Sequence, residues 1–386
     1  MNRRAKWITG GFVAAATGAA LLAARASIAT RFAGSAVNEL PVWKGRADGA
    51  PVAAAEAGLP WEVANPLRPL PEPPAGLGRS LDELKAPPTP ESVRLGRWLF
   101  FDTRLSLDHT VSCATCHRPA FGFSEPTPVS TGVHGRAGTR KAPPLLNLAW
   151  PIYPAYFWDG RAATLEEQAL GPVANSTEMG NTHDGMIQTL SGVSAYAPYF
   201  AAAFGDPRVT VDRVAHALAD YERTRFSGNS PWDRWKAGDE KAVGDGVKRG
   251  DKLFFFGKAS CNQCHLGPTF TDSRFHNLGV GFDAAAGTFK DEGRYAISKR
   301  AEDRGAFKTP TLRDVARRAP YMHDGSKTSL RGVVEFYNRG GTPNPHLSPK
   351  IKPLELTATE VDDLVALLEA LNGEGYQDDG PGAFPK

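Results

Sequence analysis

The chain has 386 residues, which is enough for two or three domains of ordinary size, and its 41% hydrophobic and 23% charged residues are typical of a folded globular protein. A formal net charge of +3 is too small to indicate a nucleic-acid-binding protein. The 40 glycines and 31 prolines, together with the near absence of strand-like alternation, predict a mostly α-helical fold with long loops and little β-structure.

The N-terminus has the pattern of an export signal. Residues 3–6 contain three basic side chains, residues 7–22 carry no charge, and Ala24 to Ala26 offer a small-residue cleavage pattern. We therefore expect residues 1–26 to be a signal peptide and the protein to be located in the periplasm. The alternative is an uncleaved anchor, because the apolar run is near the lower length limit for a spanning helix. Only in that case do we expect contact with a membrane.

Residues 27–85 are rich in Pro, Ala and Gly, which is typical of an extended lead-in rather than of a packed domain. The first helix is predicted to start at Pro90, because Thr89 supplies an N-cap and proline is favoured at the first helical position. Later helix starts are predicted from capping boxes at 164–167 (through Ala169) and 357–360, from N-caps at Thr210 and Thr328, and one helix end from Gly340-Gly341.

All four cysteines lie in two copies of the pattern C-x-x-C-H, at residues 113–117 and 261–265. This is the attachment pattern of c-type haem, in which two thiols bond to the vinyl groups and the histidine supplies the proximal imidazole. A thioredoxin-like pair would need a βαβ context, a zinc site would need further ligands, and disulfides would need no histidine. We therefore predict two covalently bound c-type haems, the first on Cys113, Cys116 and His117 and the second on Cys261, Cys264 and His265.

A repeat supports two haem domains. The segment GRWLFF at residues 96–101 precedes the first motif, and GDKLFF at residues 250–255 precedes the second. We expect an N-terminal haem domain over residues 86–230, a C-terminal haem domain over residues 231–375, and a tail over residues 376–386.

Three segments, VRLGRWLFFDTRLSLDHTVSCATCH, FWDGRAATLEEQALGPVANSTEMGN and FKTPTLRDVARRAPYMHDGS, resemble the di-haem bacterial cytochrome c peroxidase and MauG superfamily. The resemblance covers about residues 86–372 and implies two cytochrome-c-like domains with a tryptophan between the haems, which would be Trp158. It also implies that peroxide reacts at the first haem, with Gln168 and Glu178 in the distal pocket. There, a carboxylate can move a proton from one peroxide oxygen to the leaving one. Without the resemblance, Trp158 would be a core aromatic residue and the other two would be surface polar residues.

The position of Tyr337 is a further point of resemblance to the superfamily. Counted from His323, its position is where peroxidases of the superfamily place a methionine as sixth ligand of the second haem iron, and where MauG-like members place a tyrosine. An anionic oxygen ligand favours higher iron oxidation states, whereas methionine raises the reduction potential. The second haem would then store an oxidising equivalent shared through Trp158. The alternative is a core tyrosine bonded to a backbone carbonyl, with Met322 as the iron ligand.

The chain also departs from the superfamily pattern. A distal histidine that closes the first haem in many members falls on Val133 here, so we expect an open first haem and a surface His134. Members that oxidise a partner protein use a surface tryptophan two residues before the second motif, where this chain has Ala259. Trp232 and Trp235 are either another exit for oxidising equivalents or packed helix residues.

The superfamily binds calcium between the domains, partly through an asparagine of an R-N-A-P block. This chain has Lys141 at that position, and an ammonium group cannot coordinate calcium. We therefore expect a displaced or absent calcium.

Together these features predict a periplasmic di-haem c-type oxidoreductase that uses hydrogen peroxide as oxidant and is MauG-like, oxidising a tryptophan or tyrosine on a partner protein. One alternative is an ordinary cytochrome c peroxidase, which reduces peroxide with electrons from a small cytochrome or cupredoxin as donor protein. Another is a non-enzymatic di-haem electron carrier, which would need His134 or another side chain at the first iron.

Overall fold

The structure, a computed structural model, describes residues 58–151 and 155–386. These residues belong to one compact unit that spans residues 48–386. The predicted signal peptide or anchor, residues 1–26, lies outside the described residues, as does the lead-in up to residue 57. In the described ranges, no helix has both the length and the apolar character that crossing a bilayer requires.

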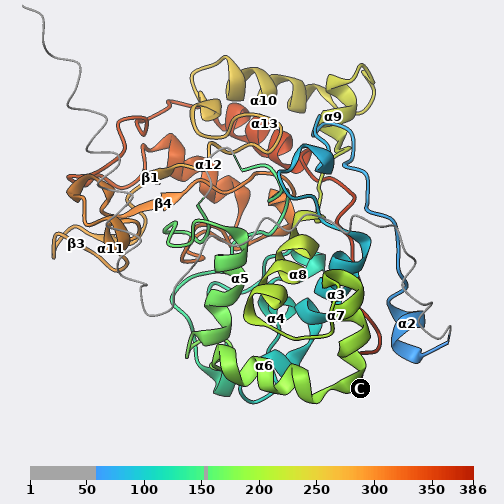
Figure 1. The fold of residues 1–386 in the computed structure, drawn as a ribbon. Coiled ribbons are helices and arrows are strands. Elements are labelled where there is room, and N and C mark those ends of the chain that lie inside the picture. Colours follow the sequence, from blue (N-terminus) through green and yellow to red (C-terminus); the bar gives the residue numbers. More distant parts are fainter. Residues whose placement is uncertain (1–57, 152–154) are drawn as a thin grey trace, which may run out of the picture. The chain divides into compact units, whose positions relative to one another are not determined.

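The fold is mostly helical, as predicted (Figure 1). The α-helices are α2 (Pro60–Ala64), α3 (Pro90–Phe101), α4 (Cys113–Cys116), α5 (Leu165–Ala174), α6 (His183–Gly192), α7 (Ala197–Phe204), α8 (Val211–Arg223), α9 (Pro231–Lys236), α10 (Asp245–Phe255), α11 (Tyr295–Ser298), α12 (Leu330–Asn338) and α13 (Ala358–Glu369). Short 3-10 helices cover Leu81–Glu83, Thr103–Leu105, Pro119–Phe121, Val133–Gly135, Ser194–Tyr196, Cys261–Gln263, Ala301–Asp303 and Val315–Arg317.

The β-structure of the described residues consists of two small antiparallel sheets. Strand β1 (Phe275–Asn277) pairs with β4 (Ala306–Lys308), and β2 (Phe282–Asp283) pairs with β3 (Thr288–Phe289). The prediction of little β-structure is therefore confirmed.

Each of the two repeated helices packs against a second helix through its glycine. A Cβ added at Gly96 of α3 would lie 1.9 Å from the carbonyl oxygen of Ala217 in α8. A Cβ added at Gly250 of α10 would lie 2.1 Å from the carbonyl oxygen of Asp363 in α13. Any larger residue would push these backbones apart, so the repeated glycine is required by close helix packing. The sequence repeat thus corresponds to a repeated helix pair.

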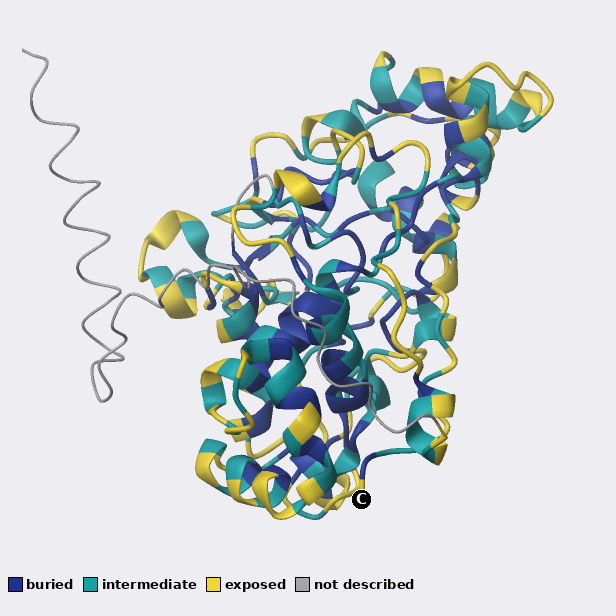
Figure 2. Ribbon diagram, turned by 45° about the vertical axis from the view of Figure 1, so that its right-hand side comes forward, coloured by how far each residue is buried: buried dark blue, intermediate teal, exposed yellow. Residues whose placement is uncertain are grey.

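Two hydrophobic cores accompany these helix pairs. The first draws on α3 and α5 to α8 and includes the fully buried Trp98 and Phe100. The second draws on α10, α12 and α13 and includes the buried Phe254 and Leu367. In Figure 2 many helices are buried along one side and exposed along the other, as expected for amphipathic helices around a core.

Most predicted helix starts are confirmed. The side chains of Thr89, Thr164, Thr210 and Thr357 each accept a hydrogen bond from a backbone N–H in the first turn of the helix they precede. These signals are local, which explains why the sequence alone reveals them.

Two helix limits differ from the prediction. The N-cap of α12 is Ser329 rather than Thr328, because the Ser329 hydroxyl accepts from the N–H of Gly332 at 3.1 Å. Helix α5 continues past Ala169 to Ala174, because its last turn packs the fully buried Val173 into the first core.

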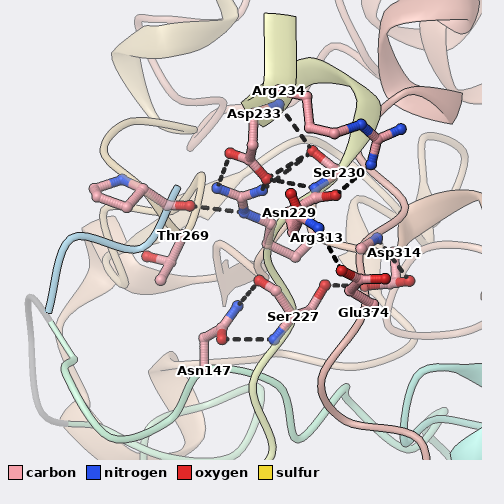
Figure 3. A network of polar contacts seen from close by, with 12 residues as sticks. Asn147, Ser227, Asn229, Ser230, Asp233, Arg234, Thr269, Arg313, Asp314 and Glu374 are labelled. Atoms are coloured by element: carbon pink, nitrogen blue, oxygen red, sulfur yellow. Dashed lines mark hydrogen bonds and ion pairs between the residues drawn. The ribbon is translucent and has the colours of Figure 1, made fainter. Parts of the chain in front are cut away.

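A buried polar network joins distant segments of the chain (Figure 3). Arg313 is fully buried and donates to both carboxylate oxygens of Asp233, one of them at 2.9 Å. Ser227 exchanges hydrogen bonds with Asn147, and its hydroxyl donates to Asp314. Because both ions of the Arg313–Asp233 pair are withdrawn from water, each depends on the other for its stability.

The described parts of the lead-in and the tail pack against the helices. Leu77 and Leu81 are buried together with Phe226. Near the C-terminus, Asp378 forms an ion pair with Arg97 of α3 at 2.6 Å.

Candidate haem sites

The two C-x-x-C-H motifs have the same local structure around their histidines. The N–H of His117 donates to the carbonyl of Cys113, and that of His265 donates to the carbonyl of Cys261, both at 2.9 Å. Each histidine Nδ1 lies 3.0 Å from a backbone carbonyl oxygen further along the chain. A carbonyl can only accept, so each Nδ1 carries the proton and each Nε2 keeps a free lone pair.

The carbonyls that orient the two histidines also match. They belong to Phe123 and Phe270, two fully buried residues with φ values of 53° and 52°. Burial lowers the pKa of His117, and it lowers the pKa of His265 to about 4. Both rings are therefore neutral, which is the form that binds a metal ion.

The cysteines of both motifs are free, so they form no disulfide. Burial raises the pKa of Cys116 to about 11, and nearby carboxylates add to this effect. Half-buried thiols with raised pKa values next to a neutral imidazole fit covalent haem attachment and do not fit a redox-active pair.

The second motif lines a cavity of about 1480 Å³, counted with its opening to solvent. Cys261, Cys264 and His265 contribute to its wall, and so do Met322 and Tyr337. Apolar side chains from α10, α12 and α13 make up much of the remainder. The cavity therefore has the donor groups and the apolar walls that a c-type haem needs.

Tyr337 reaches this cavity from the last turn of α12, beyond the buried Val334. Among the described residues, no hydrogen-bond partner of its hydroxyl is found. The structure therefore offers no support for a core tyrosine bonded to a backbone carbonyl. Burial raises the pKa of the Tyr337 hydroxyl above its ordinary value.

Trp158 belongs to the walls of two cavities. One is the cavity of the second motif, and the other, of about 770 Å³, is lined by Pro143 to Leu148 and by Gln168. The indole N–H of Trp158 donates to the carbonyl of Lys141 at 2.7 Å. Its own carbonyl accepts from the N–H of Lys308 at 2.8 Å, so both ends of the residue are fixed.

Gln168 is buried, whereas the sequence without its resemblance would place it on the surface. Its Oε1 has no hydrogen-bond partner in the part of the chain that the structure describes. A buried amide oxygen without a partner is costly in a protein interior. The atom is therefore suited to bind something other than the polypeptide.

Glu178 is half-buried and lies near the first motif. Its Oε1 accepts from the Asn175 amide at 2.8 Å, and its charge contributes to the raised pKa values of Cys113 and Cys116. Burial raises the pKa of Glu178, although Arg161 and Asn175 oppose the shift. A carboxyl group whose pKa moves toward neutrality is a better proton donor and acceptor near pH 7.

The loop before this site buries Val133 and exposes His134. Val133 is fully buried, and its N–H donates to the carbonyl of Glu178 at 2.8 Å. His134 points outward: its side chain is 51% exposed and its Nδ1 lies 3.4 Å from Asp108. The prediction of a surface histidine is confirmed.

Two titratable groups near these sites were not singled out from the sequence. Lys308, in the FKTPT segment, lines both cavities, and burial lowers its pKa to about 8. Glu222 of α8 is buried, one of its carboxylate oxygens has no partner among the described residues, and burial raises its pKa to about 8. The sequence around Glu222 is that of an ordinary helix and gives no signal for it.

A helical fold with two matched haem-attachment motifs defines a di-haem c-type oxidoreductase. The profile of the family described as "Di-haem cytochrome c peroxidase" matches residues 90–241. Methylamine utilization protein MauG of Methylorubrum extorquens is 45% identical over 289 residues, which cover 75% of this chain and 80% of the relative. Cytochrome c551 peroxidase of Pseudomonas aeruginosa is 35% identical over 330 residues, covering 84% and 89%.

Among solved structures, that of a MauG-like protein associated with microbial copper homeostasis superposes with a TM-score of 0.69. Its sequence identity is 31%, and the match covers 81% of this chain and 96% of that chain. The chain belongs to the di-haem cytochrome c peroxidase and MauG family and is an enzyme of that type. The family relation implies hydrogen peroxide and electron-transfer proteins as its partners.

Proposed function

We propose that this enzyme reacts with hydrogen peroxide at the first haem and shares the oxidising equivalents with the second haem through Trp158. The main support is that Trp158 lines the cavity of the second motif and also the cavity that contains Gln168. A rigidly held indole between two redox centres is well placed to pass an electron hole. When bound, the haems supply the redox chemistry, and the roles below belong to side chains of the protein.

His117 and His265 are the proposed proximal iron ligands, because the Nδ1 contacts leave Nε2 of both rings unprotonated. Tyr337 is the proposed sixth ligand of the second haem. Its hydroxyl faces the cavity of His265 and finds no partner among the described residues. Met322 lines the same cavity, so the assignment rests on the free hydroxyl and on the position of Tyr337 in the family pattern.

Glu178 and Gln168 are the proposed distal residues. Glu178 would take the proton from one peroxide oxygen and return it to the leaving oxygen, so that water departs as the O–O bond breaks. The unpaired Oε1 of Gln168 would accept a hydrogen bond from peroxide or from an ordered water. The exposed His134 is consistent with a first haem that keeps an open position, which argues against a pure electron carrier.

A second candidate function is an ordinary peroxidase that draws electrons from a small donor protein. One observation favours it over the oxidation of a partner protein. Ala259 is buried, and the ammonium of Lys236 lies 5.5 Å from the ring of Trp232 and 4.3 Å from that of Trp235. A cation over an aromatic ring opposes the formation of a positive hole on it. The structure therefore favours hole transfer to the protein surface neither at Ala259 nor through Trp232 and Trp235.

We also propose export to the periplasm through residues 1–26, and haem domains over residues 86–230 and 231–375. The repeated helix pairs and the two separate cores support this division.

The test is to add one equivalent of hydrogen peroxide to the diferric protein and to record the absorption spectrum of both haems. The proposal predicts a rapid and long-lived change at both. A response that requires prior reduction of one haem would replace it with the ordinary peroxidase mechanism, and no response in either state would favour the electron carrier.

A further inference from the structure

The side chain of Lys141 is deeply buried yet fully bonded to the backbone. Only 4% of the residue is exposed. Its ammonium donates to the carbonyl oxygens of Glu125 and Thr127, the latter at 3.2 Å. These two carbonyls belong to the loop that follows the first haem motif. A buried ammonium is tolerated only when such acceptors replace its water shell.

The backbone of Lys141 joins two further parts of the site. Its N–H donates to the carbonyl of His323 at 2.8 Å, and its carbonyl accepts from the indole of Trp158 at 2.7 Å. His323 lines the cavity of the second motif, where its ring stacks on Phe307 with centroids 3.5 Å apart. Lys141 thus connects the loop that follows the first motif to Trp158, which lines both cavities, and to His323, which lines the cavity of the second motif.

The residues around Lys141 do not fit a calcium ion. Calcium takes six to eight oxygen ligands, usually including carboxylates. The carboxylate of Glu125 is fully engaged, because it accepts from the Ser130 hydroxyl and the Ala142 N–H, both at 2.6 Å, and from the Thr127 hydroxyl at 3.0 Å. The two carbonyls that point inward are already bonded to the ammonium of Lys141.

We propose that the ammonium of Lys141 takes the place of a metal ion at this junction. The carbonyls of Glu125 and Thr127 bind a cation that the chain itself carries, so the position of Trp158 does not depend on calcium. Lys141 is a positioning residue, since it acts on the redox path only through Trp158. The claim that Lys141 replaces the metal depends only on the hydrogen bonds described above. The claim that Lys141 affects electron transfer between the haems also rests on the proposed function.

The replacement of a metal ion requires a positively charged Lys141 side chain. Burial lowers the pKa of Lys141 to about 8. The charge of Glu125 opposes this shift, and the charge of Arg318 adds to it. The side chain is an ammonium at neutral pH.

The test uses the full-length protein with both haems attached and three variants at this position. Lys141→Met removes the cation and leaves the two carbonyls unpaired. Lys141→Arg keeps a cation, and Lys141→Asn offers an oxygen to calcium. The matched control is Lys252→Met, because Lys252 is an exposed lysine of α10. Each protein is equilibrated with calcium and then desalted, and its bound calcium and its melting temperature are measured with and without the chelator EGTA.

The wild type is expected to retain no stoichiometric calcium and to melt at the same temperature with and without EGTA. Lys141→Met is expected to melt about 3–8 °C lower than Lys252→Met, with partial recovery in Lys141→Arg. Lys141→Asn is expected to bind calcium and to lose stability in EGTA. One calcium per wild-type chain, or equal melting temperatures for Lys141→Met and Lys252→Met, would overturn the proposal.

A separate readout concerns the haems. After one equivalent of peroxide, the second haem of Lys141→Met is expected to respond at least several-fold more slowly than that of the wild type, and EGTA is expected to change neither rate. A wild type whose second haem never responds would refute the proposed function, but the calcium and melting measurements would still decide whether Lys141 replaces the metal.

Discussion

The replacement Tyr337→Phe separates two roles of this tyrosine by the size of its effect on stability and by its effect on the haem spectrum. In the polypeptide alone, the half-buried Tyr337 lines the cavity of the second motif, and its hydroxyl has no hydrogen-bond partner among the described residues. Removing a half-buried hydroxyl that makes no hydrogen bond within the protein is expected to change the free energy of unfolding of the polypeptide by only about 0.5 kcal/mol. If the hydroxyl is an iron ligand, the same change removes a bond to the metal and destabilises the protein with its haems attached.

The assay is urea unfolding of the diferric protein, monitored together with the absorption spectrum of the second haem. We expect Tyr337→Phe to lower the free energy of unfolding and to change that spectrum, and Tyr337→Met to give a different six-coordinate spectrum. The control is Tyr196→Phe, since the buried Tyr196 hydroxyl donates to Asp102 at 2.7 Å, far from the second motif in sequence. This control is expected to lose about 1.5–3 kcal/mol, the worth of a hydrogen bond to a charged group, without a spectral change.

A Tyr337→Phe protein that is as stable as the wild type, or more stable, with an unchanged second-haem spectrum would contradict iron ligation by Tyr337. Tyr337 would then be a packing residue, and Met322 would become the candidate ligand.

Three further predictions concern other residues. Glu178→Gln is expected to slow the reaction with peroxide by about 10²–10⁴-fold in stopped-flow measurements while both haems remain attached, and a rate within a few-fold of the wild type would exclude proton transfer by Glu178. Asp233→Asn leaves the buried guanidinium of Arg313 uncompensated and is expected to cost about 3–5 kcal/mol in urea unfolding, whereas Glu302→Gln, in an exposed pair with Arg300, is expected to leave the free energy of unfolding almost unchanged. Similar losses in both variants would contradict the buried network of Figure 3. Burial raises the pKa of Glu222 to about 8 from a value of 4.5, so its contribution to stability is complete below pH 4.5 and is lost as the pH rises through 8. Glu222→Gln cannot ionise, so its stability relative to the wild type is expected to rise between about pH 5 and about pH 9, and a constant difference would contradict this account.

Much of the fold could be predicted from the sequence, and the haem-attachment motifs could be proposed from it, because their signals are local. The C-x-x-C-H motifs, the N-cap of α3 at Thr89 and the capping box of α5 each lie within a few consecutive residues. Hydrogen bonds between a side chain and the backbone three residues away depend on little else. The start of α12 was misplaced by one residue because Thr328 and Ser329 are adjacent and both can cap a helix.

The environment of the site could not be predicted, because it depends on contacts between distant segments. Gln168 is a polar position on a short helix, and only the packed structure reveals that its amide oxygen is buried without a partner. Lys308 lies between two cavities because β4 brings it next to the backbone of Trp158. The sequence suggested that Lys141 could not bind calcium, but the carbonyls that receive its ammonium come from residues 125 and 127, and no sequence pattern marks them.

The central claim is that Trp158 carries oxidising equivalents between the two haems. The most direct measurement compares the wild type with Trp158→Phe after one equivalent of hydrogen peroxide, following the spectra of both haems over time. We expect the first haem of Trp158→Phe still to react, while the response of the second haem is lost or slowed by orders of magnitude. A second haem that responds at the wild-type rate in Trp158→Phe would contradict it.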